Sequence, residues 1–282
     1  MNIKTILVHL HHTDRCNARV DLANRIARTQ GAHLIGLLPS GLLEGTIPAD
    51  VLPTGMTDYI AESARYLRQR ADAIGKSFRA RLGDGGAAGR VSSEVRETDG
   101  TSIDALVAHG RSSDLIVVGQ EDSAGEWDAP ARGLVAEVML NGGRPVLVVP
   151  YAGEFKDVGQ NVLLAWDGSR AAAVAMREAL PLLAQAQRVT LASFRRSKAA
   201  EDQTLLIPEM TRWLQRHGVR ATCEEDITEI DTSDALLSRV SDLGADLIVM
   251  GGYGHSRLRE RVMGGVTRGV LSHMTVPVLI AH

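Results

Sequence analysis

The 282-residue sequence has few aromatic residues, only two cysteines and no long uninterrupted apolar segment. Phe, Trp and Tyr make up 4% of the chain, so its core must consist mainly of Val, Leu, Ile and Ala. Cys16 and Cys223 belong to no CxxC or Cys/His cluster, which argues against a disulfide framework and a zinc site. No apolar run approaches the roughly 18–20 residues that a membrane-spanning helix needs.

The chain also lacks a large excess of either charge. Its formal net charge is −3, which argues against a nucleic-acid-binding surface. The first residues, MNIKTILVHL, enter a strand-like run at once and leave no room for a signal peptide. These features predict a cytoplasmic protein with reduced thiols that binds neither nucleic acid nor membrane.

What the sequence does contain is an internal repeat. The segment DLIVVG at 114–119 recurs as DLIVMG at 246–251, and PVLVV at 145–149 recurs as PVLIA at 277–281. Both matches have the same offset of 132 residues, a coincidence that chance rarely produces. A repeat of this length indicates two structural units of one ancestry.

The beginnings of the two repeats match at a larger offset, 156, because ILV at 6–8 resembles VLL at 162–164. The difference predicts about 24 extra residues in the first repeat, which we place around Pro39–Gly55 because Gly, Pro and Thr interrupt the periodicity there. We therefore expect two domains, residues 1–152 and 158–282, joined by a polar linker near Tyr151–Gln160.

Short apolar runs alternate with helical patterns through the second repeat. We expect strands at 162–166, 189–194, 221–227, 247–250 and 276–280, with helices between them at 170–184, 208–217 and 233–243 and after the glycine-rich loop. Pro181 should kink or shorten the first of these helices. The first repeat has the same alternation with a longer helix at about Tyr59–Leu82. The prediction is an α/β fold of two repeated open parallel five-stranded sheets, with helices on both faces, of a Rossmann-like kind.

A glycine-rich segment follows the fourth predicted strand of the second repeat, with the spacing Gly251-x2-Gly254-x9-Gly264-Gly265. Ligands of open parallel sheets bind beyond the carboxyl ends of the strands. The N–H groups of Gly265, Val266 and Thr267 would open the next helix and present donors to a phosphate. The alternative is a glycine-rich connection that binds nothing.

The end of the first strand of this repeat should lie close to that segment. Asp167 follows Ala165 and Trp166 and precedes Gly168 and Ser169. Its carboxylate could accept a hydrogen bond from a nucleotide or help to hold a metal. Equally, Asp-Gly-Ser is a favourable turn and helix N-cap, so both interpretations stay open.

These residues resemble the universal stress protein family, whose ATP-binding members carry Gly-x2-Gly-x9-Gly-(Ser/Thr) after the fourth strand and an aspartate at the end of the first. Asp167, Gly251, Gly254 and Gly264 match this pattern, whereas Gly265 replaces the Ser/Thr and removes its hydroxyl. The resemblance implies a tandem member with an adenine-nucleotide alpha-hydrolase-like fold.

The resemblance also implies a ligand and an assembly. The ligand is ATP, with ADP or AMP as alternatives and Mg as companion. The two domains should pair through their fifth strands as an intramolecular pseudo-dimer, and two chains could form a homodimer. The residues expected at the nucleotide are Ala165, Trp166, Asp167, Gly168, Gly251, Gly254, His255, Gly264, Gly265, Val266 and Thr267.

The first repeat departs from the pattern. Gly254 and Gly264 correspond to Asp122 and Arg132, and Asp167 corresponds to His11. Acidic residues at 121, 122 and 126 would repel phosphates, so we predict that the first domain does not bind ATP in this manner. His9, His11 and His12 form a cluster that is either a metal site or structural, and we predict no metal ligand.

No Ser-His-Asp arrangement, nucleophile elbow or Walker phosphate loop is present in the sequence. The leading hypothesis is a nucleotide-binding stress or regulatory module with no catalytic residue. One alternative is a slow ATP hydrolase in which Asp167 and His255 orient a water. The other is a ligand-free scaffold that binds partner proteins through the extra residues of the first repeat.

Overall fold

The structure is a computed structural model that describes residues 2–11, 15–39, 56–83, 91–121, 133–196, 206–252 and 264–282. The N-terminal half comprises β1 (Thr5–His9), α1 (Arg15–Gln30), β2 (His33–Pro39), α2 (Met56–Gly83), β3 (Ser93–Thr98), α3 (Ser102–Gly110), β4 (Leu115–Gly119), α4 (Leu134–Gly142) and β5 (Val146–Val149). The C-terminal half comprises β6 (Asn161–Ala165), α5 (Arg170–Leu183), β7 (Arg188–Arg196), α6 (Ile207–Arg216), β8 (Ala221–Thr228), α7 (Thr232–Leu243), β9 (Leu247–Gly251), α8 (Gly265–His273) and β10 (Val278–Ala281).

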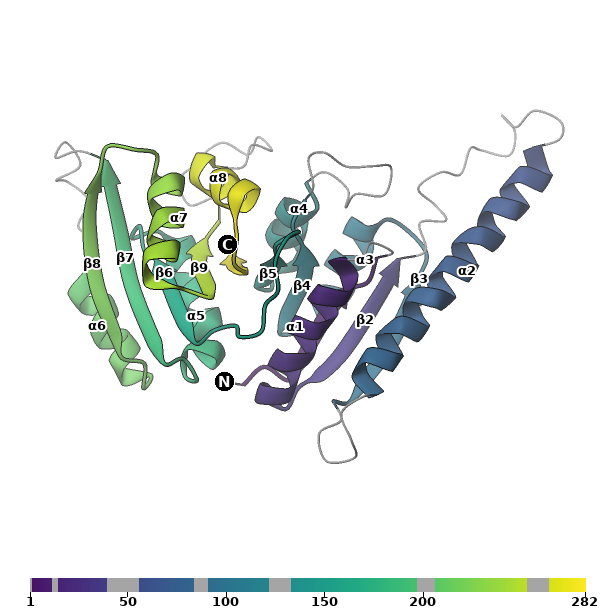
Figure 1. The fold of residues 1–282 in the computed structure, drawn as a ribbon, viewed down its shortest axis with the longest axis horizontal. Helices are drawn as coiled ribbons and strands as arrows, with labels where there is room; N and C mark the ends of the chain where they lie inside the picture. The colour runs from purple at the N-terminus through teal and green to yellow at the C-terminus, as the bar shows by residue number, and fades with distance from the viewer. Residues whose placement is uncertain are drawn as a thin grey trace.

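The strands form one sheet in the order β3-β2-β1-β4-β5-β10-β9-β6-β7-β8. Within each half all strand pairs are parallel. β5 and β10 pair antiparallel, with Leu147 opposite Leu279, so the two five-stranded sheets continue into each other. Figure 1 shows the N-terminal half on the right and the C-terminal half on the left, with the C-terminus near their junction. The predicted α/β class is confirmed, and so is the pairing of the fifth strands.

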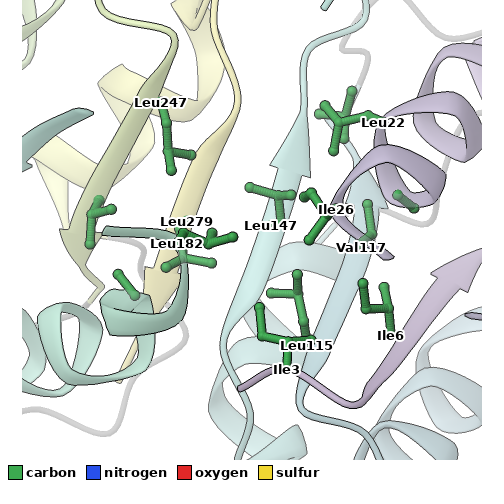
Figure 2. Packing of buried hydrophobic residues seen from close by; sticks show 14 of the residues in the cluster. Ile3, Ile6, Leu22, Ile26, Leu115, Val117, Leu147, Leu182, Leu247 and Leu279 are labelled. Atoms are coloured by element: carbon green, nitrogen blue, oxygen red, sulfur yellow. The ribbon is translucent and has the colours of Figure 1, made fainter. Parts of the chain in front are cut away.

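Helices cover both faces of the sheet because side chains alternate along each strand. Ile6 and Val8 of β1 belong to a core shared with α1, α2, α5 and α6, whereas Leu7 belongs to the opposite core, under α3, α4, α7 and α8. Both cores run across the junction of the halves. Figure 2 shows Leu147 of β5 facing Leu279 of β10 and Leu182 of α5 there. Val, Leu, Ile and Ala dominate both clusters, as the low aromatic content predicts.

The helix α2 accounts for part of the extra length of the N-terminal half. It has 28 residues, against 10 in α6, its counterpart. The expectation of a longer helix is therefore correct, but the additional residues do not all lie around Pro39–Gly55, and residues 40–55 are outside the described ranges. In Figure 1, the first turns of α2 extend well past the edge of the sheet.

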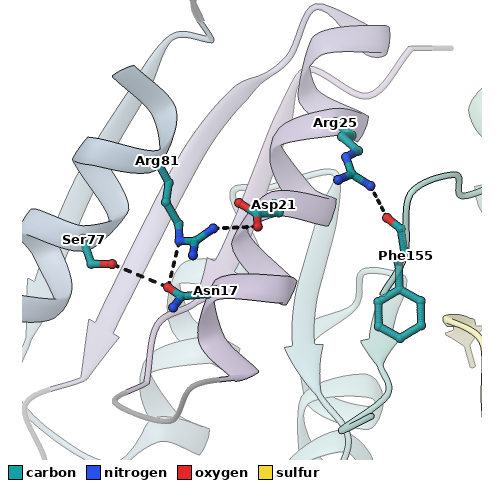
Figure 3. A network of polar contacts seen from close by, with 6 residues as sticks. All are labelled: Asn17, Asp21, Arg25, Ser77, Arg81 and Phe155. Atoms are coloured by element: carbon teal, nitrogen blue, oxygen red, sulfur yellow. Dashed lines mark hydrogen bonds and ion pairs between the residues drawn. The ribbon is translucent and has the colours of Figure 1, made fainter. Parts of the chain in front are cut away.

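Polar contacts attach α2 to α1, and α1 to the segment between β5 and β6 (Figure 3). Arg81 of α2 donates from Nε to Asn17 Oδ1 at 2.9 Å and from Nη1 to Asp21 Oδ2 at 2.6 Å. The side chains of Arg81 and Asp21 are 37% and 40% exposed, so this ion pair contributes at most about 1 kcal/mol. Arg25 of α1 donates to the carbonyl of Phe155, which lies in that segment.

Pro181 lies inside α5, which continues to Leu183 and so ends within one residue of the prediction. The carbonyl oxygen of Pro181 accepts a hydrogen bond of 2.9 Å from Gln30 Nε2 at the end of α1.

Among the residues that the structure describes, no helix is both long enough and apolar enough to cross a bilayer.

Candidate functional site

The candidate site lies at the carboxyl ends of β6 and β9, which are neighbours in the sheet. After Ala165, the N–H of Trp166 donates to Ala192 O at 2.8 Å, and the Trp166 side chain is 7% exposed. Trp166 is therefore a core residue at this edge. Asp167 is exposed, and its Oδ1 accepts a hydrogen bond of 2.9 Å from the N–H of Ser169.

Ser169 is the N-cap of α5, because its Oγ accepts a hydrogen bond of 3.1 Å from the N–H of Ala172. The turn-and-cap interpretation of Asp167-Gly168-Ser169 is thus confirmed, with Ser169 as the cap and Asp167 closing the turn before it. This arrangement leaves the carboxylate of Asp167 at the surface, so capping does not remove it from the site.

Gly251, the last residue of β9, packs directly against the first turn of α5. A Cβ atom at this position would lie 2.4 Å from Ala172 N and 2.6 Å from the carbonyl carbon of Ala171. Real Cβ atoms essentially never come so close to backbone, so only glycine fits here. The first glycine of the motif thus has a packing role, which brings β9 and the start of α5 together.

The amino end of α8 carries the backbone donors expected for an anion. Its N-cap is Gly264, which makes no side-chain capping hydrogen bond, and the first turn holds no acidic residue. The helical bonding begins with Arg268 N donating to Gly264 O at 3.0 Å. The N–H groups of Gly265, Val266 and Thr267 therefore have no acceptor within the helix, and they carry its positive dipole end.

The surroundings of this helix end are open on one side. Among the residues the structure describes, no atom lies within 4 Å of a Cβ built on Gly264 or Gly265, whereas Thr267 is only 5% exposed. Gly264 and Gly265 thus place no side chain of their own over the first N–H groups. Gly254 and His255, which the sequence also places at the site, lie outside the described ranges.

The corresponding helix end in the N-terminal half is already occupied. Glu121 accepts a hydrogen bond of 3.0 Å from Gly133 N through Oε2 and one of 3.1 Å from Val135 N through Oε1. At the offset of 132, these donors correspond to the N–H groups of Gly265 and Thr267. In the described ranges, a carboxylate of the chain itself therefore caps the start of α4, whereas no side chain caps the start of α8.

The sequence suggested acidic residues at this place but did not identify the one that makes the contact. The alignment puts Asp122 opposite Gly254, whereas the capping carboxylate belongs to Glu121, the residue before it. Asp122, Glu126 and Arg132 lie outside the part of the chain that the structure describes.

Comparison with known proteins assigns the C-terminal half. Residues 159–282 match the model of the universal stress protein family. The C-terminal half of the chain is therefore similar to this family. Universal stress protein Slr1230 of Synechocystis sp. (strain ATCC 27184 / PCC 6803 / Kazusa) is 26% identical over 198 residues, which is 68% of this chain and 66% of that protein. The match thus spans just under two thirds of that relative's length.

Solved structures show that the whole chain has a known architecture. A universal stress protein from Archaeoglobus fulgidus DSM 4304 superimposes with a TM-score of 0.70, at 13% identity, over 98% of this chain and 95% of that one. A protein from Pseudomonas aeruginosa UCBPP-PA14 superimposes with a TM-score of 0.58, at 17% identity, over 99% of this chain and 93% of that one. At these identities the likeness establishes a shared fold that includes the N-terminal half.

His9 and His11 lie close together at the end of β1. His9 is 1% exposed, neither of its ring nitrogens has a hydrogen-bond partner among the described residues, and its ring centroid lies 5.9 Å from that of His11. In the described ranges, no three His, Cys, Asp or Glu residues are grouped so as to hold a metal, and His12 lies outside those ranges. Arg19 Nε donates to His9 O at 2.8 Å.

Burial of His9, together with the nearby Arg19 and His11, lowers the pKa of its imidazole well below 6.5. Below that pH the unfolded chain binds a proton that the folded protein does not, so stability is lost as the pH falls toward the folded-state pKa. We expect the free energy of unfolding to drop by up to about 1.4 kcal/mol per pH unit in this window.

Urea unfolding between about pH 7.5 and pH 5 measures this dependence. The His9→Leu variant should lose this component of the slope, whatever its stability at neutral pH. His217→Gln, which changes an exposed histidine, should retain it. Equal slopes in all three proteins would show that His9 does not control the response.

Proposed function

We propose that this chain is a universal stress protein that acts as a stress-response or regulatory module and binds an adenine nucleotide in its C-terminal half, with the phosphates on the amino end of α8. The observation that carries the proposal is the start of α8, where, among the described residues, no side chain caps the helix and no atom lies within 4 Å of a Cβ built on Gly264 or Gly265. Such a helix end binds phosphate through backbone donors and the helix dipole. A cytoplasmic location stays a prediction from the sequence.

The end of β6 supplies the second part of the proposed site. Asp167 is exposed there, one strand away from β9. Its carboxylate would accept a hydrogen bond from the ribose or help to hold an Mg²⁺ ion carried by the nucleotide. Ala165 and Gly168 flank it and present little side chain to the ligand. Gly254 and His255 belong to the proposal on sequence grounds alone.

The N-terminal half is proposed not to bind a nucleotide in this manner. Glu121 already satisfies two donors at the start of α4, and a phosphate would have to displace this carboxylate from a favourable helix end. Repulsion between the two negative groups would oppose that exchange. The proposal therefore requires one nucleotide per chain.

Isothermal titration of the full chain with ATP, ADP and AMP, with and without Mg²⁺, tests the proposal. Cyclic AMP joins the series because another universal stress protein has been solved in complex with it. We expect one site per chain and an affinity about tenfold or more lower in Gly265→Asp, since the new carboxylate faces the phosphates. An acidic residue in the first turn favours the helix itself, so this variant should fold normally.

Gly265→Ser serves as the matched variant, because it adds a small side chain at the same open position together with a hydroxyl donor. It should bind at least as tightly as the unmodified protein. Absence of binding by any of the nucleotides would favour the ligand-free scaffold. Two sites per chain would contradict the exclusion of the N-terminal half. Unchanged binding by Gly265→Asp would show that the start of α8 is not the phosphate site.

A further inference from the structure

Gln120 of the N-terminal half reaches across the junction to the helix that carries the proposed phosphate site. It follows β4 directly and is 5% exposed. Its side-chain Nε2 donates to Leu271 O at 2.8 Å and to Ser272 O at 3.2 Å, both in the last turn of α8. Its Oε1 accepts a hydrogen bond of 3.0 Å from Tyr151 N. The amide thus caps the carboxyl end of a helix in the other half.

The same junction holds a second contact related to this one by the internal repeat. At the offset of 132, Gln120 corresponds to Gly252 and Leu271 corresponds to Met139 of α4. A Cβ on Gly252 would lie 2.5 Å from Met139 Sδ, so the thioether fills the space that a side chain would need. The two equivalent contacts therefore differ. One is a polar cap on α8, and the other is an apolar contact over the backbone after β9.

The consequence is that α8 is held at its carboxyl end by a residue of the N-terminal half. The helix has nine residues and no side-chain cap at its amino end, and it packs on α7, where a Cβ built on Gly269 would lie 2.4 Å from Ser233 Oγ. A helix this short moves as a rigid body, and a shift at Leu271 and Ser272 would displace the N–H groups at Gly265–Thr267.

Gln120 and Glu121 are consecutive and act on the two equivalent helices. Glu121 closes the amino end of α4, while Gln120 caps the carboxyl end of α8. We propose that Gln120 is a positioning residue for nucleotide binding, through which the N-terminal half aligns the phosphate-binding end of α8 in the C-terminal half. This inference rests on the proposed function.

Gln120→Glu tests the inference with an isosteric change. The variant keeps an acceptor for Tyr151 N–H but turns a carboxylate oxygen toward the carbonyls of Leu271 and Ser272, which repel it. Titration of the full chain should show ATP affinity about tenfold lower, because a buried donor is replaced by an acceptor. Adenosine, which has no phosphates, should lose less than about twofold.

Gln30→Glu is the matched control. Gln30 is also buried, at 6% exposure, and also crosses the junction, donating from Nε2 to Pro181 O at 2.9 Å on α5. The Gln30→Glu variant introduces the same charge at the junction of the halves but does not contact α8. We expect the ratio of ATP affinity to adenosine affinity to stay unchanged in this variant. Where Gln120→Glu fails to fold, Gln120→Met removes the amide at similar size and should show the same ratio change.

The outcomes separate the inference from the proposed function. ATP binding in the unmodified protein with an unchanged ATP-to-adenosine ratio in the Gln120 variants would overturn the positioning role alone. Equal loss in the Gln120 and Gln30 variants would overturn it too, because it would reflect a generally weakened junction. Binding of neither ATP nor adenosine by the unmodified protein would refute the proposed function and the inference together.

Discussion

Replacing Gly251 with alanine is expected to lower the free energy of unfolding by about 3 kcal/mol, near the upper end of the usual range for overpacking. The new methyl group would lie 2.4 Å from Ala172 N and 2.6 Å from the carbonyl carbon of Ala171. Both are backbone atoms at the start of α5, which Ser169 caps, so they cannot turn away as a side chain can. Either β9 or the first turn of α5 must shift. Urea unfolding of the two proteins measures the loss.

Gly119→Ala is the matched control, since Gly119 occupies the equivalent position at the end of β4. There the new methyl group would lie 2.4 Å from Nη1 of Arg19, the far end of a long side chain. The guanidinium is buried and its Nε donates to His9 O at 2.8 Å, but the end of a side chain shifts more readily than backbone does, so we expect a smaller loss than at Gly251, about 1–2 kcal/mol. A loss at Gly251 no larger than that at Gly119 would contradict the role assigned to the α5 backbone.

The contrast between these glycines explains what the sequence could and could not predict at the site. The periodicity of apolar residues predicted the strands and the helices, because both depend on local sequence. The alternation of strands with helices predicted that the strands pair parallel within each half. A glycine after a strand indicates only that something approaches the backbone closely. Among the described residues, a Cβ on Gly251 would meet the backbone at the start of α5, whereas a Cβ on Gly265 would meet no atom within 4 Å. Nothing in the glycine spacing distinguishes the two positions.

The contacts that shape the site across the junction were beyond sequence reasoning for a different reason. The pairing of β5 with β10 brings Gln120 and Leu271 within hydrogen-bonding distance of each other. Periodicity within either half does not predict the register in which these two strands pair. Only the family resemblance predicted that these strands pair. The sequence indicated Glu121 as one of several acidic residues near this helix end. Its role as the cap depends on how its side chain lies relative to the N–H groups of Gly133 and Val135.

Asp246, the first residue of the repeated DLIV motif, is the second position at which we expect substitution to cause a large loss of stability. Its carboxylate accepts hydrogen bonds from Gly159 N at 2.8 Å, Gln160 N at 3.0 Å and Asn161 N at 3.1 Å. These donors lead into β6, so the carboxylate ties that strand to the start of β9. Asp246→Ala leaves all three without this acceptor and should lower the free energy of unfolding by about 2–4 kcal/mol.

Two further variants show whether the hydrogen bonds are responsible. Among the described residues, Asp114, the equivalent residue, accepts from two backbone N–H groups, Lys4 N at 2.8 Å and Thr5 N at 2.9 Å, so Asp114→Ala should lower the free energy of unfolding less than Asp246→Ala does. Burial raises the pKa of Asp246 against the opposing effect of its backbone donors, so the ionised carboxylate is held at a desolvation cost. The Asp246→Asn variant has no such desolvation cost and keeps one acceptor oxygen. Its free energy of unfolding should therefore fall by about half as much as that of Asp246→Ala. Equal losses for Asp246→Ala and Asp114→Ala would show that the number of anchored N–H groups does not set the stability of these junctions.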